Sequence, residues 1–339
     1  MKKGIREELI NFKLENEILK NKNMKVDTTN LYDTDAPKML AMYVYKLVKK
    51  VLSGMSKDSD DNKVEKQIDL INNVIDIVAE EYEEDGLRIS KPEILKYVLD
   101  ETEIDKITKK KGVVIPQTSI SHSTIFTGAH KEPVYYSEIQ KEILSCDKVD
   151  IIISFIRLSG LRLIYNQLKE FTDKGGKLRI ITTVYMGATE AKAIKQLNEL
   201  KNTEIKISYE TKSSRLHTKS YIFHRENGYT TAYVGSSNIS YSAMKSGLEW
   251  NMKVTNQDLD DVISNIIAQY NVYWESSEFE LYSQSDYEKL CDALNKENDN
   301  VDIDKITTLK PYRYQQLVLD KVEVERKIHN NYKNLLVCP

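Results

Sequence analysis

Apolar residues recur every three to four positions along the first part of the chain, to about Ile107, a spacing typical of amphipathic helices. Pro37 suits the first turn of the second apolar segment, and Ser90 is a candidate cap for the fourth. The pattern predicts an α-helical N-terminal domain over residues 1–110, and such stripes more often form a structural or docking module than a reaction site. The predicted helices are 4–21, 36–54, 63–82 and 90–101.

Beyond about Val113 the pattern changes to short apolar runs that alternate with amphipathic segments. This alternation of strand and helix predicts a largely parallel sheet covered by helices. Ligand sites in such folds gather beyond the carboxyl ends of the strands, where the segments SFIRLSG and TTVYMGAT lie. The predicted strands are 149–156, 177–185 and 204–210, and the helices between them are 159–174 and 188–202.

Two further β-rich runs, 217–224 and 228–236, are joined by a segment whose Asn-Gly pair supplies the positive φ angles of a tight hairpin. A helix with an aromatic end and a polar linker follow. We therefore expect an α/β fold over residues 111–285, with a mixed, largely parallel sheet flanked by helices. Residues 286–339 are expected to form a linker and the start of a further unit, in which a helix leads to a truncated apolar strand.

The composition narrows the class of protein. The 339 residues are 40% hydrophobic and 30% charged, without an apolar run of membrane-spanning length or a secretory leader, so we expect a cytoplasmic protein with no membrane partner. The three cysteines lie far apart and the histidines do not cluster, which argues against a disulfide framework and a structural zinc site. With a net charge of -3, any phosphate-binding surface must be local.

His217 and Lys219 stand two positions apart in a predicted strand, so their side chains project from the same face. An imidazole beside an ammonium is unfavourable if both are charged. This pairing favours a neutral, nucleophilic His217 and leaves Lys219 free to hold an anion. A lone histidine on a strand is more often a structural residue, so the interpretation depends on the residues that follow.

A Gly-Ser-Ser-Asn run follows the second strand of the hairpin. Ser236, Ser237 and Asn238 offer hydrogen bonds to non-bridging phosphate oxygens, and Gly235 lets the backbone come close. Glu249 could accept a hydrogen bond from an imidazole N–H and fix its tautomer. The run alone is more often a turn. Combined with the His-x-Lys pair, it predicts a phosphoryl-transfer site that needs no metal.

The stretch from His217 to Glu249 resembles the phospholipase D superfamily, whose signature is H-x-K-x4-D followed by G-S-x-N. His224 stands at the Asp position of that signature, which in the family supports the structure. The resemblance implies that His217 attacks phosphorus to form a phosphohistidine, while a second histidine protonates the leaving oxygen and then activates water. Since the chain holds one such motif, we expect a homodimer in which His217 of another copy is the second histidine.

A wider resemblance covers nearly the whole chain, in segments such as IIISFIRLSGLRLI, RLHTKSYIF and GLEWNMKVT. These segments are similar to the phospholipase D-type nuclease region at the N-terminus of bacterial superfamily 2 (DEAD/DEAH-box) helicases. In the tail PYRYQQ, the resemblance implies that Gln315 reads adenine. The phosphate-binding loop is absent before Pro339, so we expect a fragment of a longer protein. ATP and Mg would serve only the full-length helicase, and no cofactor is expected for the nuclease.

We expect nucleic acid as the partner, with DNA ahead of RNA, because a helicase-like tail implies a polynucleotide and nothing resembles a lipid anchor. Ser237 is a candidate contact to the substrate. Further candidate contacts to phosphates are Arg157, Arg162, Arg215 and Lys245, which would make binding weaken steeply with salt. The alternative for each cation is a solvated surface charge.

Two other functions compete with a nuclease. The first is a catalytically silent DNA-binding or dimerisation module of a superfamily 2 helicase, which His224 at the Asp position favours. The second is a lipid phosphodiesterase. A role in phage defence follows only by association with the family.

Overall fold

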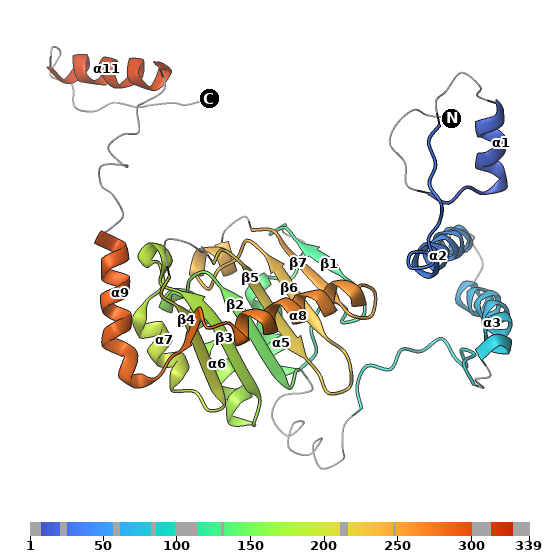
Figure 1. Cartoon of the computed structure of the whole chain (residues 1–339), viewed down its shortest axis with the longest axis horizontal. Helices are drawn as coiled ribbons and strands as arrows, with labels where there is room; N and C mark the ends of the chain where they lie inside the picture. The colour runs from blue at the N-terminus through green and yellow to red at the C-terminus, as the bar shows by residue number, and fades with distance from the viewer. Residues whose placement is uncertain are drawn as a thin grey trace. The chain divides into compact units, whose positions relative to one another are not determined.

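The computed structural model of the chain describes residues 8–20, 26–56, 62–82, 86–98, 114–129, 132–210, 216–246, 249–299 and 313–327. The chain divides into two units, Met1–Glu101 and Thr102–Pro339. The first unit carries helices, and the second carries a sheet with helices on its faces (Figure 1). No helix in the described part of the chain is long and apolar enough to cross a membrane.

Three helices of the first unit form where the apolar spacing predicts them. They are α1 (Phe12–Lys20), α2 (Ala36–Met55) and α3 (Lys63–Tyr82). Pro37 lies in the first turn of α2, where its fixed φ and missing N–H are tolerated. No residue of α2 is buried, so the apolar stripe of this helix keeps part of its surface exposed within the described structure.

The fourth predicted helix, over residues 90–101, is wrong for its described part, because residues 90–98 are not helical. Asn72 of α3 binds the backbone of Ile89 on both sides: Ile89 N–H donates to Asn72 Oδ1 at 2.8 Å, and Asn72 Nδ2 donates to the Ile89 carbonyl at 3.2 Å. Ile94 further along is 79% exposed. Without an apolar surface to cover, a short helix has too little packing to form.

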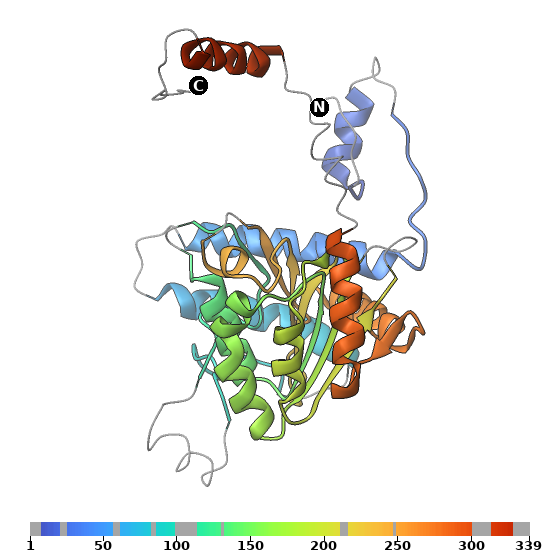
Figure 2. The same cartoon turned by 90° about the vertical axis from the view of Figure 1, so that its left-hand side faces the viewer.

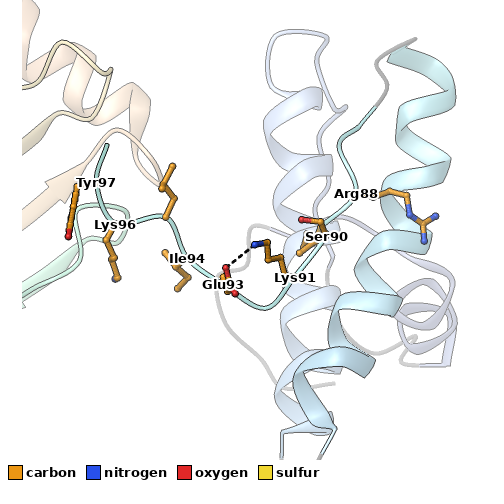
Figure 3. A pocket seen from close by; sticks show the side chains of 9 residues that line it. Arg88, Ser90, Lys91, Glu93, Ile94, Lys96 and Tyr97 are labelled. Carbon is orange, nitrogen blue, oxygen red and sulfur yellow. Dashed lines mark ion pairs between the residues drawn. The ribbon is translucent and has the colours of Figure 1, made fainter. Parts of the chain in front are cut away.

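The segment 88–97 borders a hollow of about 580 Å³ (Figure 3). Every side chain that lines it is exposed, and its charged groups include the exposed ion pair of Lys91 with Glu93 at 3.3 Å. An exposed pair of this kind contributes little to binding or stability. The hollow is therefore open surface rather than a formed site.

The second unit is built on one eight-stranded sheet with the order β1-β7-β6-β5-β2-β3-β4-β8. Its α/β class with a mixed sheet and flanking helices is confirmed. The sheet is less parallel than predicted, since only the β2–β3 and β3–β4 pairings are parallel, and the other pairings are antiparallel. Helical crossovers join the parallel strands, whereas a short turn joins β5 to β6 and the longer segment 236–250 joins β6 to β7. The strands are β1 (Thr124–Phe126), β2 (Lys148–Ile153), β3 (Lys177–Thr183), β4 (Thr203–Ser208), β5 (Lys219–His224), β6 (Thr231–Gly235), β7 (Asn251–Thr255) and β8 (Phe279–Leu281).

Helices cover both faces of this sheet (Figures 1 and 2). The first face packs against α5 (Tyr135–Leu144), α6 (Leu158–Asp173) and α7 (Ala191–Asn198), and the second packs against α8 (Asp260–Glu275). Side chains alternate between the two cores along β2, since Val149 and Ile151 belong to the first core and Ile152 to the second. The remaining helices include η1 (Tyr185–Gly187), the π-helix η2 (Ser242–Ser246), α9 (Tyr287–Asp299) and α11 (Arg313–Lys327).

Glu142 of α5 is a fully buried carboxylate in the first core. Arg225 Nη2 lies 2.5 Å from its Oε2, and Lys253 Nζ lies 2.8 Å from its Oε1. The hydroxyls of Thr231 and Tyr233 donate to the same carboxylate at 2.9 and 3.0 Å. Burial alone would raise the pKa of Glu142, but the charges and hydrogen bonds of Arg225 and Lys253 lower it. The ionised carboxylate thus ties α5 to β6 and β7.

We expect Glu142→Gln to lower the free energy of unfolding by about 3–5 kcal/mol, because it removes the nearest counter-charge of two buried cations and leaves Lys253 only Glu138 at 3.9 Å. Urea unfolding followed by circular dichroism measures the loss. The matched control is Glu170→Gln on α6, whose pair with Lys174 at 2.8 Å lies near solvent and contributes at most about 1 kcal/mol. Equal losses in the two variants would contradict the role given to burial.

Candidate active site

The predicted catalytic residues lie at one edge of the sheet. Lys219 pairs with Ile153, so β5 begins where β2 ends. Gly235 pairs with Asn251, so β6 ends where β7 begins. The carboxyl ends of the parallel strands β2 and β3 reach the same edge, where ligand sites of such sheets are expected. The candidate residues at this edge are His217, Lys219, Ser236, Asn238 and Glu249.

Lys219 is a buried lysine with a fixed ammonium group, since only 6% of the residue is exposed. Its Nζ donates to the His217 carbonyl at 2.6 Å and to Ser154 Oγ at 3.1 Å, and it lies 3.0 Å from His217 Nδ1. Burial lowers the pKa of Lys219, and the negative charge of Glu249 opposes this shift. A partly desolvated cation held at one point is suited to bind an anion.

His217 is exposed, in contrast to the lysine beside it. The Lys219 ammonium faces Nδ1, so Nε2 is the ring nitrogen that a substrate can meet. The tautomer then decides the chemistry. When the ammonium donates to Nδ1, a neutral ring carries its proton on Nε2, and this nitrogen has no lone pair for attack. When Nδ1 carries the proton and the ammonium donates to the His217 carbonyl and to Ser154 instead, the Nε2 lone pair can attack phosphorus. A ring protonated on both nitrogens can give its Nε2 proton to a leaving oxygen.

Asn238 follows β6 and is almost fully buried. Its Oδ1 accepts a hydrogen bond from Phe155 N–H at 3.3 Å, which leaves the amide Nδ2 as the group that can donate to a phosphate oxygen. The residues around it are tied to the end of β2, because Arg157 N–H donates to the Ile239 carbonyl at 2.8 Å. The loop that contains Asn238 is thus anchored to the segment that directly follows β2 and contains Ser154.

The two serines of the run hold this loop against β7. Ser236 Oγ accepts from Trp250 N–H at 3.2 Å and donates to the Trp250 carbonyl at 3.4 Å. Ser237 is fully buried, accepts from Asn251 Nδ2 at 2.8 Å and donates to the Ala243 carbonyl at 3.2 Å. The sequence assigns Ser237 to the substrate, whereas the structure engages its hydroxyl inside the protein, where it positions the loop.

Glu249 lies at the same edge, at the entry to β7. None of the hydrogen bonds among the described residues joins it to His217, whose Nδ1 faces Lys219. Its charge nevertheless acts on its surroundings. Burial lowers the pKa of Lys219 and raises that of Tyr135, and the Glu249 charge opposes the first shift and adds to the second. The structure therefore places Glu249 beside the His-Lys pair without a direct bond to the imidazole.

The candidate cations near the site are exposed. Arg157 directly precedes α6, Arg162 lies in that helix, and Lys245 lies in η2. Arg215 lies outside the described residues, as does the side chain of Gln315 in α11. The phosphate contacts expected of the four cations stay predictions, as does the adenine contact expected of Gln315.

His224 lies at the opposite end of β5 from the candidate active site. Its Nε2 lies 2.9 Å from Oδ2 of Asp150, a carboxylate that is 1% exposed. Arg179 binds both oxygens of this carboxylate at 2.7 and 2.8 Å, and Lys148 Nζ lies 2.9 Å away. Burial would raise the pKa of Asp150, but these hydrogen bonds hold it well below its usual range. The contacts of His224 are thus structural ones.

Sequence reasoning missed three residues of this arrangement: Ser154, Asp150 and Asn251. Ser154 directly follows β2, whose carboxyl end was expected to carry ligand groups, so its position was a usable signal. Asp150 interrupts an apolar run, and a charge there indicates a buried partner. Asn251 had no comparable signal, because its partner Ser237 is set by the pairing of β6 with β7.

Within the described residues, no group of three or more His, Cys, Asp or Glu side chains could hold a metal ion. The cation that the structure fixes at this edge is the ammonium group of Lys219.

Residues 139–274, about two fifths of the chain, match the family model described as the phospholipase D-like domain of cardiolipin synthase. The matched segment runs from α5 to α8 and includes the His-x-Lys pair and the Gly-Ser-Ser-Asn run. No curated protein matches the chain. The second unit thus contains a phospholipase D-like domain.

Three solved structures are similar to this chain. NucT from Helicobacter pylori is 21% identical over 46% of this chain and 96% of its own, with a TM-score of 0.38. Nuc of Salmonella typhimurium, a phospholipase D family member, is 17% identical over 48% of this chain and 100% of its own, also at 0.38. Phosphatidylserine synthase of Haemophilus influenzae is 10% identical over 55% of this chain and 47% of its own, with a TM-score of 0.38.

The loop that carries Asn238 depends on a close approach of α6 at Gly160. A Cβ at this glycine would lie 2.3 Å from the Ser240 backbone nitrogen and 2.4 Å from the Ile239 carbonyl carbon. Gly160→Ala should lower the free energy of unfolding by about 1–3 kcal/mol, because overpacking against backbone outweighs the gain of about 1 kcal/mol in helix propensity. Thermal and urea unfolding measure the change.

The control for this variant is Ser159→Ala, the exposed preceding position of the same helix, which should change stability by less than about 0.5 kcal/mol. If Gly160→Ala instead stabilises the protein as an open helical glycine would, α6 does not support the loop in the way described.

Proposed function

We propose that the phospholipase D-like domain is a metal-independent phosphodiesterase that cleaves nucleic acid through a phosphohistidine at His217. The observation that carries this proposal is the contact between the buried Lys219 ammonium and His217 Nδ1 at 3.0 Å. It sets a cation for phosphate oxygens beside an exposed imidazole nitrogen. Asn238, anchored on the same edge, supplies a further hydrogen-bond donor.

The reaction proceeds by two displacements at phosphorus. In the first, His217 Nε2 attacks, a nitrogen–phosphorus bond forms, and the bond to the leaving oxygen breaks while that oxygen takes a proton from a second histidine. In the second, this histidine removes a proton from water, the water oxygen attacks phosphorus, and His217 is released. Lys219 and Asn238 neutralise the charge on the non-bridging oxygens at both stages.

The second histidine belongs to another copy of the chain in this proposal. Among the described histidines, His224 lies at the far end of β5 and binds Asp150. His122 precedes β1, and it lies away from the catalytic edge because Thr124 pairs with Lys253 while Phe126 pairs with Asn251. A homodimer that brings two His217 side chains together supplies both the nucleophile and the acid.

A polynucleotide substrate is supported by the exposed cations that flank the site, Arg157, Arg162 and Lys245. The sequence of the tail, similar to the start of a helicase domain, favours the same substrate, with DNA ahead of RNA. A full-length helicase-nuclease that uses ATP and Mg, with a role in phage defence, is the wider proposal.

The competing function is a silent nucleic-acid-binding or dimerisation module, and the departure at His224 is the feature that favours it. The pairing of His224 with Asp150 weakens that alternative, because His224 makes structural contacts at the end of β5 far from the His-Lys pair. A module of this kind would bind DNA at every condition and cut it at none.

Wild type should cleave a labelled oligonucleotide in the presence of EDTA, because the proposed chemistry uses no metal. His217→Ala should reduce the rate by about 10³-fold or more, since it removes the attacking atom. Gel electrophoresis of the products measures cleavage, and His122→Ala is the matched control that should keep wild-type activity. Binding without cleavage by wild type, with or without EDTA and added metal, would support the silent module.

The homodimer gives a second, independent outcome. When wild type and His217→Ala chains are co-expressed and mix freely, only dimers with two wild-type chains hold both histidines. At equal amounts, about a quarter of the dimers should be active, whereas independent monomers would leave about half of the chains active. The nuclease activity per total amount of chain distinguishes the shared site from independent monomers, and light scattering checks the mass of the dimer. A strictly monomeric protein that still cuts DNA contradicts the shared site.

A further inference from the structure

A pocket of about 210 Å³ lies directly beside the candidate active site. It lies between the loop that precedes α5, the first turn of α5, the π-helix η2 and the entry to β7. Polar and apolar surfaces line it in equal measure, and charged groups reach it from two sides. The residues that characterise it are Phe126, Tyr135, Met244, Lys245, Glu249 and Asn251.

We propose that this pocket receives the nucleobase of a nucleotide whose phosphate is held by His217 and Lys219, so that the enzyme cleaves next to an unpaired base. The inference rests on the proposed function and names its substrate more closely. A base enters such a pocket only when it is unstacked, which occurs in single strands and at frayed or damaged positions.

The pocket and the phosphate site share a wall. Glu249 lines the pocket and lies close enough to Lys219 for its charge to act on the ammonium. Asn251 also lines the pocket, and its side chain binds Ser237 in the loop that presents Asn238. A ligand that places a phosphate on Lys219 would therefore extend its adjoining group toward this pocket.

The size and chemistry of the pocket suit one planar ring system. Pockets for drug-sized ligands measure about 300–1,000 Å³, so this smaller one excludes a lipid chain or a whole dinucleotide. Phe126 and Tyr135 lie edge to face, with centroids 5.9 Å apart, and Met244 adds a polarisable side chain. Aromatic and thioether surfaces pack well against the faces of bases.

Two charged side chains of the pocket can meet the edge of a base. Glu249 can accept a hydrogen bond from a base N–H, and Lys245 can donate one to a base carbonyl. The Tyr135 hydroxyl is sealed from solvent, so this residue contributes its ring and not its hydroxyl to the lining.

A quaternary ammonium headgroup fits this lining less well. Glu132 accepts from Thr127 N–H at 2.6 Å, from Thr127 Oγ1 at 2.8 Å and from Gly128 N–H at 3.0 Å. Its carboxylate is therefore engaged in shaping the wall. Lys245, which also lines the pocket, repels a cation. Glu249 alone does not make the anionic aromatic cage that choline recognition requires.

Calorimetric titrations on the full chain test this inference. The probes are inorganic phosphate, thymidine, thymidine 3′-monophosphate, thymidine 5′-monophosphate and phosphocholine. One of the two thymidine monophosphates should bind wild type at least about tenfold more tightly than inorganic phosphate, a gain that the base supplies. Thymidine alone reports on the pocket, and inorganic phosphate alone reports on the His-Lys pair.

Two variants test whether the pocket is the source of this gain in affinity over inorganic phosphate. Ala129→Trp fills the mouth of the pocket from an exposed position, and it should abolish the gain while binding of inorganic phosphate stays unchanged. Its matched control is Ala268→Trp, at an exposed position of α8 outside the pocket lining, which should keep the gain in affinity. Val134→Trp changes a second exposed residue of the lining and should also abolish the gain, which keeps the test valid if Ala129→Trp does not fold.

The outcomes separate the two proposals. If wild type does not bind inorganic phosphate but binds thymidine, and Ala129→Trp blocks this binding, the phosphodiesterase proposal is contradicted and the pocket is supported. If phosphate binds and both monophosphates bind no better, the pocket inference is overturned while the phosphate site stands. Tighter binding of phosphocholine than of either monophosphate overturns the assignment to a nucleobase.

Discussion

The antiparallel pairing of β5 with β2 joins the parallel half of the sheet to its antiparallel half, and both ends of β5 depend on its register. At one end, Lys219 opposite Ile153 brings the ammonium to Ser154. At the other end, His224 opposite Lys148 lies within reach of Asp150. A slip of one residue would move every side chain of β5 to the other face, so the site and its support would be lost together.

A buried charge specifies this register. Arg179 donates hydrogen bonds to both carboxylate oxygens of Asp150, and His224 and Lys148 contact Oδ2. The Arg179 guanidinium in turn lies over the rings of Tyr270 and Trp274 of α8, at 5.0 and 4.8 Å from their centroids. A buried ion pair adds little net stability over an apolar alternative, but any other alignment would leave the carboxylate desolvated and unpaired. The arrangement disfavours wrong pairings more than it stabilises the right one.

Local patterns of the sequence predicted most of the elements and the edge on which the candidate residues lie. Alternation within a strand places His217 and Lys219 together, and helix periodicity predicts α2, α3 and α6. Features that depend on tertiary contacts were not predictable in this way. Strand direction follows the connections, residues 90–98 lack a surface to pack against, and the partners of the Ser237 hydroxyl come from η2 and β7.

The hydrogen bond from Lys219 to the carbonyl of His217 closes a short ring within a three-residue segment. The distance between the cation and the imidazole is thus limited by that segment itself, and Ser154 after β2 holds the ammonium from the other side. Loops around the edge can then change in length and composition while the reacting pair keeps its spacing. Such a division lets substrate preference evolve, or be redesigned, separately from bond cleavage.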